Sequence, residues 1–257
     1  MIKFGTDGWR AKISDEFTFE NVRLVTQGYV NYLKKKGSAN KGLVIGYDNR
    51  FQSENFAYEA AKVAASNGIK VYLTEKSVPS QVTSLSVKKK NAAGGVMITA
   101  SHNPAEWNGF KIKAPYGGSA PQEITKAVEK EVQDLISKKD TPKTGTGYEK
   151  LITKFNPKKD YFDHIAKLVD FSLIKKANIN IAVDPMHGSA IGYLKDILSD
   201  NGIKSEEINN NRDPLFGGIN PEPLPINLEE LSSYTSELSL KNSNPTVGIA
   251  LPCMGST

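Results

Sequence analysis

The chain has 257 residues, of which 39% are hydrophobic and 24% are charged. A chain of this length and composition can bury a substantial core, which excludes a disordered or collagen-like protein and favours two domains over one. The formal net charge of +5 comes from 33 basic and 28 acidic residues, but only four of the basic residues are arginine. Nucleic-acid-binding grooves usually combine arginine with aromatic side chains, so we expect a lysine-rich solvated surface and no nucleic-acid partner.

Cysteine content and hydropathy exclude further classes of protein. Cys253 is the only cysteine, which excludes an intramolecular disulfide and a four-cysteine zinc site within one chain. No signal peptide opens the chain, and no apolar run approaches the ~20 residues of a membrane-spanning helix. We therefore expect a cytoplasmic protein with no membrane partner.

Helix and strand patterns alternate along the first half of the chain. The opening MIKFGTDGWRAK predicts a short strand that runs into a glycine-interrupted loop. Apolar residues at helical spacing predict a helix at 19–36. Two more helices are expected, one at 53–67 with Ser53 as its N-cap and Gly68 just beyond its end, and one in the Ser/Thr-rich segment after Pro79. Short apolar runs predict buried strands at 42–47, 69–73 and 95–99. This alternation is typical of a layered α/β domain with a largely parallel sheet.

The segment 137–150, SKKDTPKTGTGYEK, predicts a surface linker because it loses apolar periodicity and carries a proline and two glycines. The expected domains are residues 1–143 and 144–257. A second alternation follows, with strands expected at 179–184, after Gly202 and at 246–251, and helices at 160–169, 192–199 and 228–238. The expected fold is two layered α/β domains with mixed, largely parallel sheets.

A polar run from Thr99 to Pro104 directly follows a predicted strand. Ligands of α/β folds generally bind at the carboxyl ends of parallel strands, and Pro104 restricts Asn103 to extended conformations. Ser101 is therefore a candidate nucleophile or phosphate carrier. His102 beside it need not be its base, because adjacent strand residues project to opposite faces. The same residues also suit a purely structural turn.

A serine hydrolase is the rival interpretation of a serine next to a histidine. Such an enzyme would carry a G-x-S-x-G elbow and a histidine far along the chain in a suitable loop. The elbow is absent, His164 falls on a predicted amphipathic helix, and His187 follows a strand within DPMHG. The sequence therefore disfavours a hydrolase.

Six motifs, in this order, make the chain similar to the α-D-phosphohexomutase superfamily, the phosphoglucomutases and phosphomannomutases. They are FGTDGWRA at 4–11, GYDNR at 46–50, ITASHNPAEWNGFKIK at 98–113, YGGSA at 116–120, VDPMHGSA at 183–190 and DPLFGGINPEP at 213–223. The resemblance implies the fold of the family's first two domains. It also implies a parent enzyme, an intramolecular phosphotransferase, that interconverts hexose 1-phosphate and hexose 6-phosphate through a hexose 1,6-bisphosphate.

The resemblance assigns roles to five residues. It implies that Ser101 carries the phosphoryl group that passes to a hydroxyl of the hexose phosphate. Arg10 matches a residue that holds phosphate through its fork of donors, and Lys111 matches one that donates or accepts a proton. His102 and Asn103 match positions that orient the phosphoserine loop, which adds His102 to the expected catalytic residues. Asn103 joins Arg10 and Lys111 as an expected substrate-binding residue.

Other matched residues are interpreted as structural. Trp107 is expected to pack rather than to contact a ligand, and Asp7 is expected to form an ion pair with Arg50. We expect Gly117 and Gly118 to form a tight turn. The loops around Asp184, His187 and Gly188 and around Gly217 and Gly218 are expected to lie at the domain interface.

The family's metal loop, D-G-D-A-D-R or a close variant, marks the departure from the family. It supplies three carboxylates to Mg²⁺, and an oxygen of the phosphoserine, here on Ser101, completes the protein's contribution. In this chain the strand expected at 246–251 is followed by PCMGST at 252–257, which contains no carboxylate. Mg²⁺ prefers hard, anionic oxygen ligands, so the resemblance implies a cofactor whose aspartate ligands are missing from the sequence.

The family's third and fourth domains have no counterpart in the sequence, so we expect an inactive chain when it is alone. Residues 252–257 have three interpretations: an expression fragment, a frameshifted or spliced product, and a natural truncated relative with a non-enzymatic role. A fragment or truncated form of a mutase is favoured. The alternative is a non-enzymatic module that binds a phosphosugar or a protein, and the coding sequence downstream of Leu251 would distinguish the two. The preferred hexose stays open, with glucose and mannose favoured over glucosamine.

Overall fold

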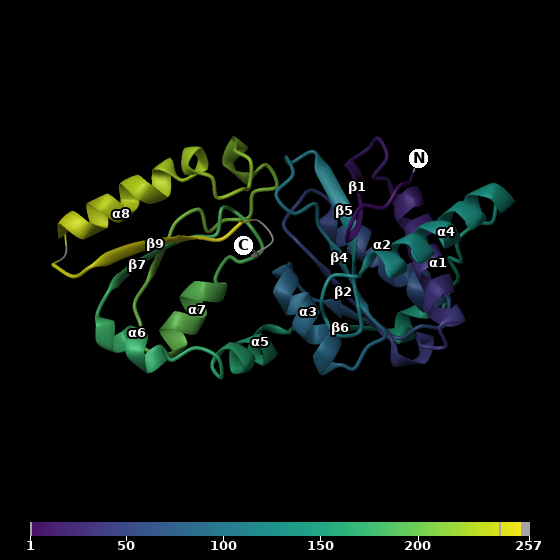
Figure 1. Cartoon of the computed structure of the whole chain (residues 1–257), viewed down its shortest axis with the longest axis horizontal. Coiled ribbons are helices and arrows are strands. Elements are labelled where there is room, and N and C mark those ends of the chain that lie inside the picture. The colour runs from purple at the N-terminus through teal and green to yellow at the C-terminus, as the bar shows by residue number, and fades with distance from the viewer. Residues whose placement is uncertain (1, 242, 253–257) are drawn as a thin grey trace.

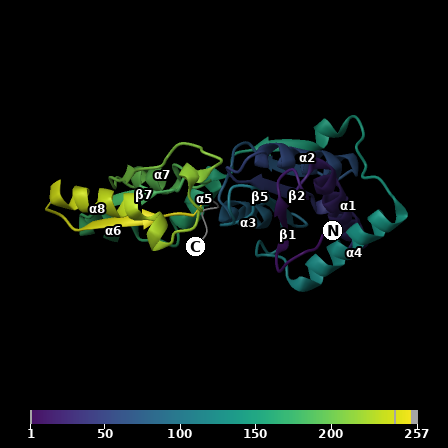
Figure 2. The same cartoon turned by 90° about the horizontal axis from the view of Figure 1, so that it is seen from above.

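The computed structural model describes residues 2–241 and 243–252. These residues form two units, each built on its own sheet, which lie side by side along the longest axis of the molecule (Figure 1, Figure 2). Cys253 and the rest of the tail at 253–257 lie outside the described residues. Within the described part of the chain, no helix has the length and apolar character needed to cross a membrane.

The first unit, residues 2–155, contains a six-stranded sheet in the order β1-β5-β4-β2-β3-β6. Its strands are β1 (Gly8–Lys12), β2 (Leu43–Tyr47), β3 (Val71–Thr74), β4 (Gly95–Ile98), β5 (Trp107–Lys113) and β6 (Ile152–Phe155). The four strands from β4 to β6 are parallel, whereas β5 is antiparallel to both of its neighbours. The sheet is therefore mixed and largely parallel, as predicted.

Four helices cover this sheet. They are α1 (Phe19–Lys35), α2 (Ser53–Ser66), α3 (Ser80–Lys89) and α4 (Gln122–Lys138). The expectation that Ser53 caps α2 is wrong, because Gln52, in a left-handed conformation, precedes the helix and Ser53 is its first residue. The side chain of Ser53 donates to Asp48 instead.

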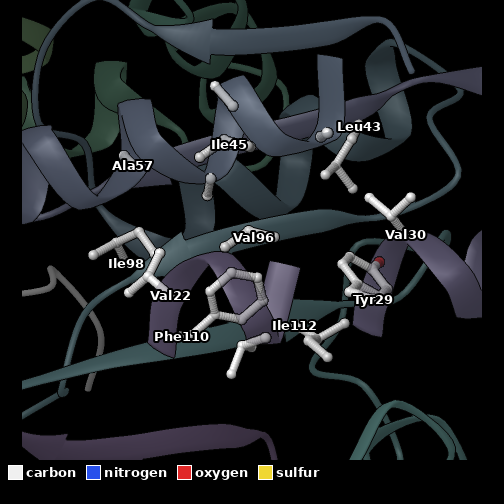
Figure 3. Packing of buried hydrophobic residues seen from close by; sticks show 14 of the residues in the cluster. Val22, Tyr29, Val30, Leu43, Ile45, Ala57, Val96, Ile98, Phe110 and Ile112 are labelled. Carbon is white, nitrogen blue, oxygen red and sulfur yellow. The ribbon is translucent and has the colours of Figure 1, made fainter. Parts of the chain in front are cut away.

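The strand period of two divides the core of the first unit between the two faces of the sheet. Leu43 and Ile45 of β2 join the larger cluster with residues of α1, α2 and α4 (Figure 3). Val44 joins a smaller cluster with Val87 of α3. Each fully buried aliphatic side chain of this kind contributes about 1.5–3 kcal/mol. Burial on both faces explains why these strands read as continuous apolar runs.

The expected linker contains the end of α4 and an exposed segment up to the 3-10 helix η2 (Tyr148–Leu151). Beyond it, β6 pairs with β3 in the sheet of the first unit. Strand pairing therefore favours a boundary after Phe155 over the expected one at residue 143. The position of the boundary stays a proposal, which limited proteolysis tests.

The second unit, residues 156–252, has a parallel three-stranded sheet in the order β8-β7-β9. Its elements are α5 (Lys158–Ile165), α6 (Phe171–Ala177), β7 (Asn180–Asp184), α7 (Tyr193–Asp200), β8 (Glu206–Glu207), α8 (Glu229–Lys241) and β9 (Thr246–Ala250). Helix α8 covers one face of the sheet, with α6 and α7 on the other (Figure 1). Two layered α/β units confirm the predicted fold class.

Short 3-10 helices complete the chain: η1 (Ala39–Lys41), η3 (Phe216–Gly218) and η4 (Pro225–Asn227). The second unit has a small core, in which the main cluster holds four buried residues, Ile181, Val183, Leu198 and Ile203. By contrast, the main cluster of the first unit runs through five of its strands and three of its helices. The first unit is therefore the more firmly packed support for the candidate site at its edge.

Candidate functional site

Ser101 lies in the loop that leaves the carboxyl end of β4. Its backbone is left-handed, with φ of 61°, a conformation that is uncommon for a residue other than glycine. Its N–H donates to Thr99 Oγ1 at 3.1 Å, and the N–H of Thr99 still pairs with the carbonyl of Gly109 in β5. The chain therefore turns sharply between Thr99 and Ser101.

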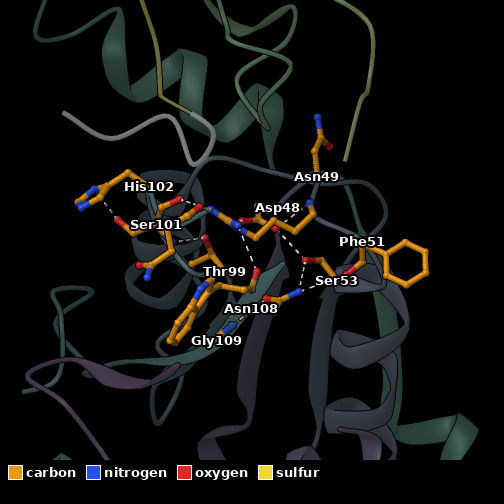
Figure 4. A network of polar contacts seen from close by, with 12 residues as sticks. Asp48, Asn49, Phe51, Ser53, Thr99, Ser101, His102, Asn108 and Gly109 are labelled. Carbon is orange, nitrogen blue, oxygen red and sulfur yellow. Dashed lines mark hydrogen bonds and ion pairs between the residues drawn. The ribbon is translucent and has the colours of Figure 1, made fainter. Parts of the chain in front are cut away.

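His102 is exposed, and its Nδ1 lies 3.4 Å from Oγ of Ser101 (Figure 4). Strand alternation does not separate the two side chains, because Ser101 has left the extended conformation. The ring is thus within contact distance of the candidate phosphate carrier. Whether it donates or accepts there depends on its tautomer.

The pairing of β1 with β5 brings Arg10 and Lys111 to the same edge. In the register, Gly8 faces Lys111 and Arg10 faces Gly109. Lys111 Nζ lies 3.0 Å from Oδ2 of Asp7, and an Arg10 nitrogen lies 3.6 Å from Oδ1 of the same carboxylate. The other terminal nitrogen of Arg10 donates to Asn103 Oδ1 at 2.9 Å. Asp7 therefore holds two of the expected site residues together.

The electrostatics of this cluster follow from burial and close charge. Burial opposes ionisation of Asp7, but Lys111 and then Arg10 outweigh it and hold the pKa of Asp7 below its usual value. Lys113, buried two residues beyond Lys111 on the same strand, has its pKa lowered by burial and then by the charge of Lys111. A cluster of three cations around one carboxylate leaves an excess of positive charge that suits an anionic ligand.

Arg50 is the most enclosed cation of the described chain, with a fully buried side chain. Its guanidinium donates to four carbonyl oxygens of the loop that contains Ser101, at 2.6–3.1 Å: those of Ser101, Asn103, Pro104 and Trp107. The carbonyl groups of an irregular loop need such donors when they are buried. The fork of donors explains why arginine suits this position.

The partners of Arg50 and Asp7 correct the expected ion pair between those two residues. Asp7 pairs with Lys111 and Arg10, whereas Arg50 lies 3.3 Å from Oδ2 of Asp48. The expectation failed because each residue has a closer partner of opposite charge within its own motif or on the paired strand.

A buried polar network fixes Asp48 (Figure 4). Its Oδ1 accepts from the N–H of Arg50 at 3.0 Å and from Oγ of Ser53 at 2.7 Å. Asn108 then donates to Ser53 at 2.9 Å. The network ties the carboxyl end of β2 and the start of α2 to β5.

Two contacts join this network to the second unit. Asn49 donates from its amide to the carbonyls of His187 and Gly188, at 2.9 and 2.8 Å. The guanidinium carbon of Arg50 lies 5.1 Å from the ring centre of Phe216, which is 1% exposed. The loop around His187 therefore contacts the turn after β2, and the loop around Phe216 packs on Arg50 and on Ala105 of the Ser101 loop.

Several expected residues also have plainer positions. Trp107 is half-buried at the start of β5, and its backbone carbonyl is the part that contacts Arg50. Asp184 is buried, which raises its pKa despite the hydrogen bond it accepts from the N–H of Met186. Sequence reasoning missed Asn49 and Phe216, although both stand inside motifs singled out above.

The described residues around Ser101 do not fit a Mg²⁺ site. Across residues 2–241 and 243–252, no group of three histidine, cysteine, aspartate or glutamate side chains could hold a metal ion. Asp7, the carboxylate of the cation cluster, is already paired with Lys111 and Arg10. Mg²⁺ needs near-octahedral oxygen ligands, which this donor set does not offer.

Comparison with known proteins gives a family match for each of the two units. Residues 1–139 match the family model for phosphoglucomutase/phosphomannomutase α/β/α domain I, and residues 159–251 match that for α/β/α domain II. A phosphoglucomutase of Komagataeibacter xylinus is 30% identical over 229 residues, and one of Staphylococcus aureus (strain bovine RF122 / ET3-1) is 32% identical over 241. These alignments cover 84% and 86% of this chain but 41% and 42% of the relatives.

Solved structures agree with these matches. A crystal structure of a candidate phosphomannomutase from Thermus thermophilus has a TM-score of 0.88 and 31% identity, and covers 99% of this chain and 55% of its own. The Paramecium phosphoglucomutase pp63/parafusin, at 22% identity, shares the fold with a TM-score of 0.80 over 98% of this chain and 52% of its own. The chain thus spans about half the length, or less, of the proteins it matches.

Proposed function

Because this chain belongs to the phosphoglucomutase/phosphomannomutase family, we propose that it is the N-terminal part of a phosphohexomutase that carries a phosphoryl group on Ser101. The observation that carries the proposal is the convergence of Arg10, Asn103 and Lys111 beside the Ser101 loop. Separate strands, β1 and β5, supply the cations at the carboxyl end of β4. The parent enzyme interconverts hexose 1-phosphates and hexose 6-phosphates, and a cytoplasmic location belongs to the same proposal.

In the proposed reaction the phosphorus–oxygen bond at Ser101 Oγ breaks as a bond forms to a free hydroxyl of the hexose phosphate. The product is a hexose 1,6-bisphosphate. After the bisphosphate reorients, its other phosphoryl group returns to Ser101, and the isomeric monophosphate leaves. Phosphoryl transfer depends mainly on positioning and on charge stabilisation, which is what a preorganised cation cluster supplies.

The side chains of the cluster have distinct proposed tasks. Arg10 binds the phosphoryl oxygens with its fork of donors, because Asn103 and Asp7 already orient its guanidinium. Lys111 donates or accepts the proton of the reacting hydroxyl, and Asp7 holds its amine at 3.0 Å. His102, 3.4 Å from Ser101 Oγ, contacts the carrier oxygen and orients the loop.

The chain alone is proposed to lack turnover. It spans 41–42% of the curated relatives, so more than half of each relative has no counterpart in the sequence. The carboxylates that the family resemblance assigns to Mg²⁺ are also missing from the sequence after Leu251. Loss of one preorganised electrostatic contact commonly lowers a rate by about 100- to 1000-fold, so loss of a metal site and of sugar-binding domains should abolish measurable turnover.

Reconstitution tests the proposal. In a coupled assay from glucose 1-phosphate to glucose 6-phosphate with Mg²⁺, we expect no turnover from the chain alone. We expect turnover from a chimera in which this chain replaces the matching part of a full-length relative. The chimera with Ser101→Ala should be inactive, whereas the matched variant Ser119→Ala, on an exposed loop, should keep its activity. Turnover by the chain alone, or by the Ser101→Ala chimera, would contradict the proposal.

A further inference from the structure

The loop that presents Ser101 is held by hydrogen bonds of its own, such as the one from the N–H of Asn103 to the carbonyl of Ala100, and also by one side chain from outside the loop. This outside side chain bonds the carbonyls of three residues: Ser101 at the left-handed turn, Asn103, and Trp107 at the entry into β5. All of these carbonyl groups point to the guanidinium of Arg50, which comes from the turn after β2. A buried guanidinium that donates to several carbonyls stabilises one loop conformation against its alternatives.

The second unit completes the enclosure of Arg50. Phe216 lies with its ring 5.1 Å from the guanidinium carbon, and it packs against Ala105 of the Ser101 loop. Its own backbone is left-handed, with φ of 55°. Asp213 holds that turn by accepting from the N–H groups of Leu215 and Gly217, at 2.9 Å each. Strained backbone that is held in place by its surroundings is typical of functional loops.

A second contact keeps the same two surfaces together. Asn49, the neighbour of Arg50, donates to the carbonyls of His187 and Gly188. Met186 and His187 are both left-handed, so this contact also falls on a constrained loop. Two adjacent residues of the first unit thus reach two separate loops of the second unit.

Building on the proposed function, we propose that Arg50 is a positioning residue for phosphoryl transfer and that Phe216 completes its action. Arg50 holds the Ser101 loop so that the serine faces the cluster of Arg10 and Lys111. Phe216 covers the guanidinium, excludes water from its hydrogen bonds and adds a cation–π contact, which is strongest when desolvated. Docking of the second unit therefore sets the shape of the phosphate-carrying loop.

Hydrogen exchange on the chain itself tests whether Arg50 and Phe216 stabilise the Ser101 loop, and it needs no catalytic step. In Arg50→Lys, we expect amides of residues 99–107 to exchange about tenfold faster or more, because a lysine cannot bond four carbonyls. In Phe216→Leu, we expect the same amides to exchange about threefold faster or more, because the cation–π contact with Arg50 is lost. Residues 43–47 of β2 serve as the internal reference and should exchange unchanged. The matched control is Arg23→Lys, whose ion pair with Glu59 lies away from the loop on α1 and α2.

Chemical rescue separates positioning from general support of the fold. Methylguanidinium added to Arg50→Ala should slow exchange at 99–107 again, whereas the same concentration of sodium chloride should not. Unchanged loop exchange in Arg50→Lys and Phe216→Leu would overturn the proposal. So would faster exchange that is equal in the loop and in β2, because Arg50 would then stabilise the unit as a whole.

The phosphoryl-transfer readout uses the chimera. In Arg50→Lys the rate of Ser101 labelling by glucose 1,6-bisphosphate should fall by about 100-fold, the usual cost of misplacing a reacting group. The bisphosphate concentration that half-saturates labelling should change little, because Arg50 bonds the loop rather than the ligand. Equal labelling rates in the wild-type and Arg50→Lys chimeras would overturn the inference but leave the proposed function standing. Absence of Ser101 labelling in the wild-type chimera would contradict the proposed function, while loop exchange would still decide the role of Arg50.

Discussion

Replacement of Asp7 by asparagine removes the carboxylate that pairs with Lys111 and Arg10 in the cation cluster. Lys111 is only 6% exposed, and Asp7 is 23% exposed. Breaking a buried pair costs about 3–5 kcal/mol, and losing an exposed one costs about 0.2–1 kcal/mol. Because the exposure of this pair is intermediate, we expect Asp7→Asn to lower the free energy of unfolding by about 2 kcal/mol. For a unit of this size, that loss lowers the melting temperature by about 4–8 °C.

The loss should depend on pH with a defined sign. Because the folded-state pKa of Asp7 is lowered, its stabilisation is present in full above the unfolded-state pKa of about 3.9. The stabilisation disappears as pH falls through the folded-state pKa. The difference in unfolding free energy between the wild-type chain and Asp7→Asn should therefore be largest at neutral pH and shrink in acid.

Urea unfolding followed by tryptophan fluorescence is the assay. Both tryptophans, Trp9 and Trp107, lie on β1 and β5, so the signal reports the first unit and the cluster itself. The matched control is Asp134→Asn on α4. It removes the carboxylate of an exposed ion pair with Lys130 and should leave the free energy of unfolding unchanged. A loss of stability in Asp7→Asn no larger than that in the control, or one that stays constant into acid, would mean that the pairing of Asp7 with Lys111 and Arg10 does not stabilise the first unit.

The remaining predictions concern the frame around the site. Gly8→Ala should weaken the pairing of β1 with β5 and cost more than Gly37→Ala in urea unfolding, because an added Cβ would lie 2.2 Å from the carbonyl oxygen of Phe110, whereas nothing lies within 4 Å at Gly37. Equal losses in the two variants would contradict that view. Limited proteolysis should cut first within 137–150, where most side chains are exposed. A first cut inside β7 would argue against the division into two units.

Local patterns were enough to predict much of the fold. The apolar runs of β2 and β4 and the helical spacing of α1 appear in the sequence because each element buries its apolar residues against near neighbours. β5 was harder to predict, because WNGFKIK carries two lysines whose burial depends on the partner strand. β6 was missed for a similar reason, since its place in the first sheet depends on pairing with a distant strand, β3, in which Val71 is the partner of Ile152.

The candidate site was predictable only in part. Ser101, Arg10 and Lys111 stand in motifs, so the sequence identified them as candidate site residues. It did not predict the distances between their side chains. Their actual partners are set by the register of β1 with β5, which places Gly8 opposite Lys111 and so brings Asp7 to its amine. The partners of Arg50 come from loops far along the chain, and no local spacing encodes such contacts.

Peptide mass spectrometry of the chimera shows whether Ser101 carries the phosphoryl group, as proposed above. After exposure to glucose 1,6-bisphosphate, we expect one added phosphate, located on Ser101 and absent in Ser101→Ala. Phosphate found on a different serine, such as Ser119, or retained in the Ser101→Ala chimera would contradict this proposal.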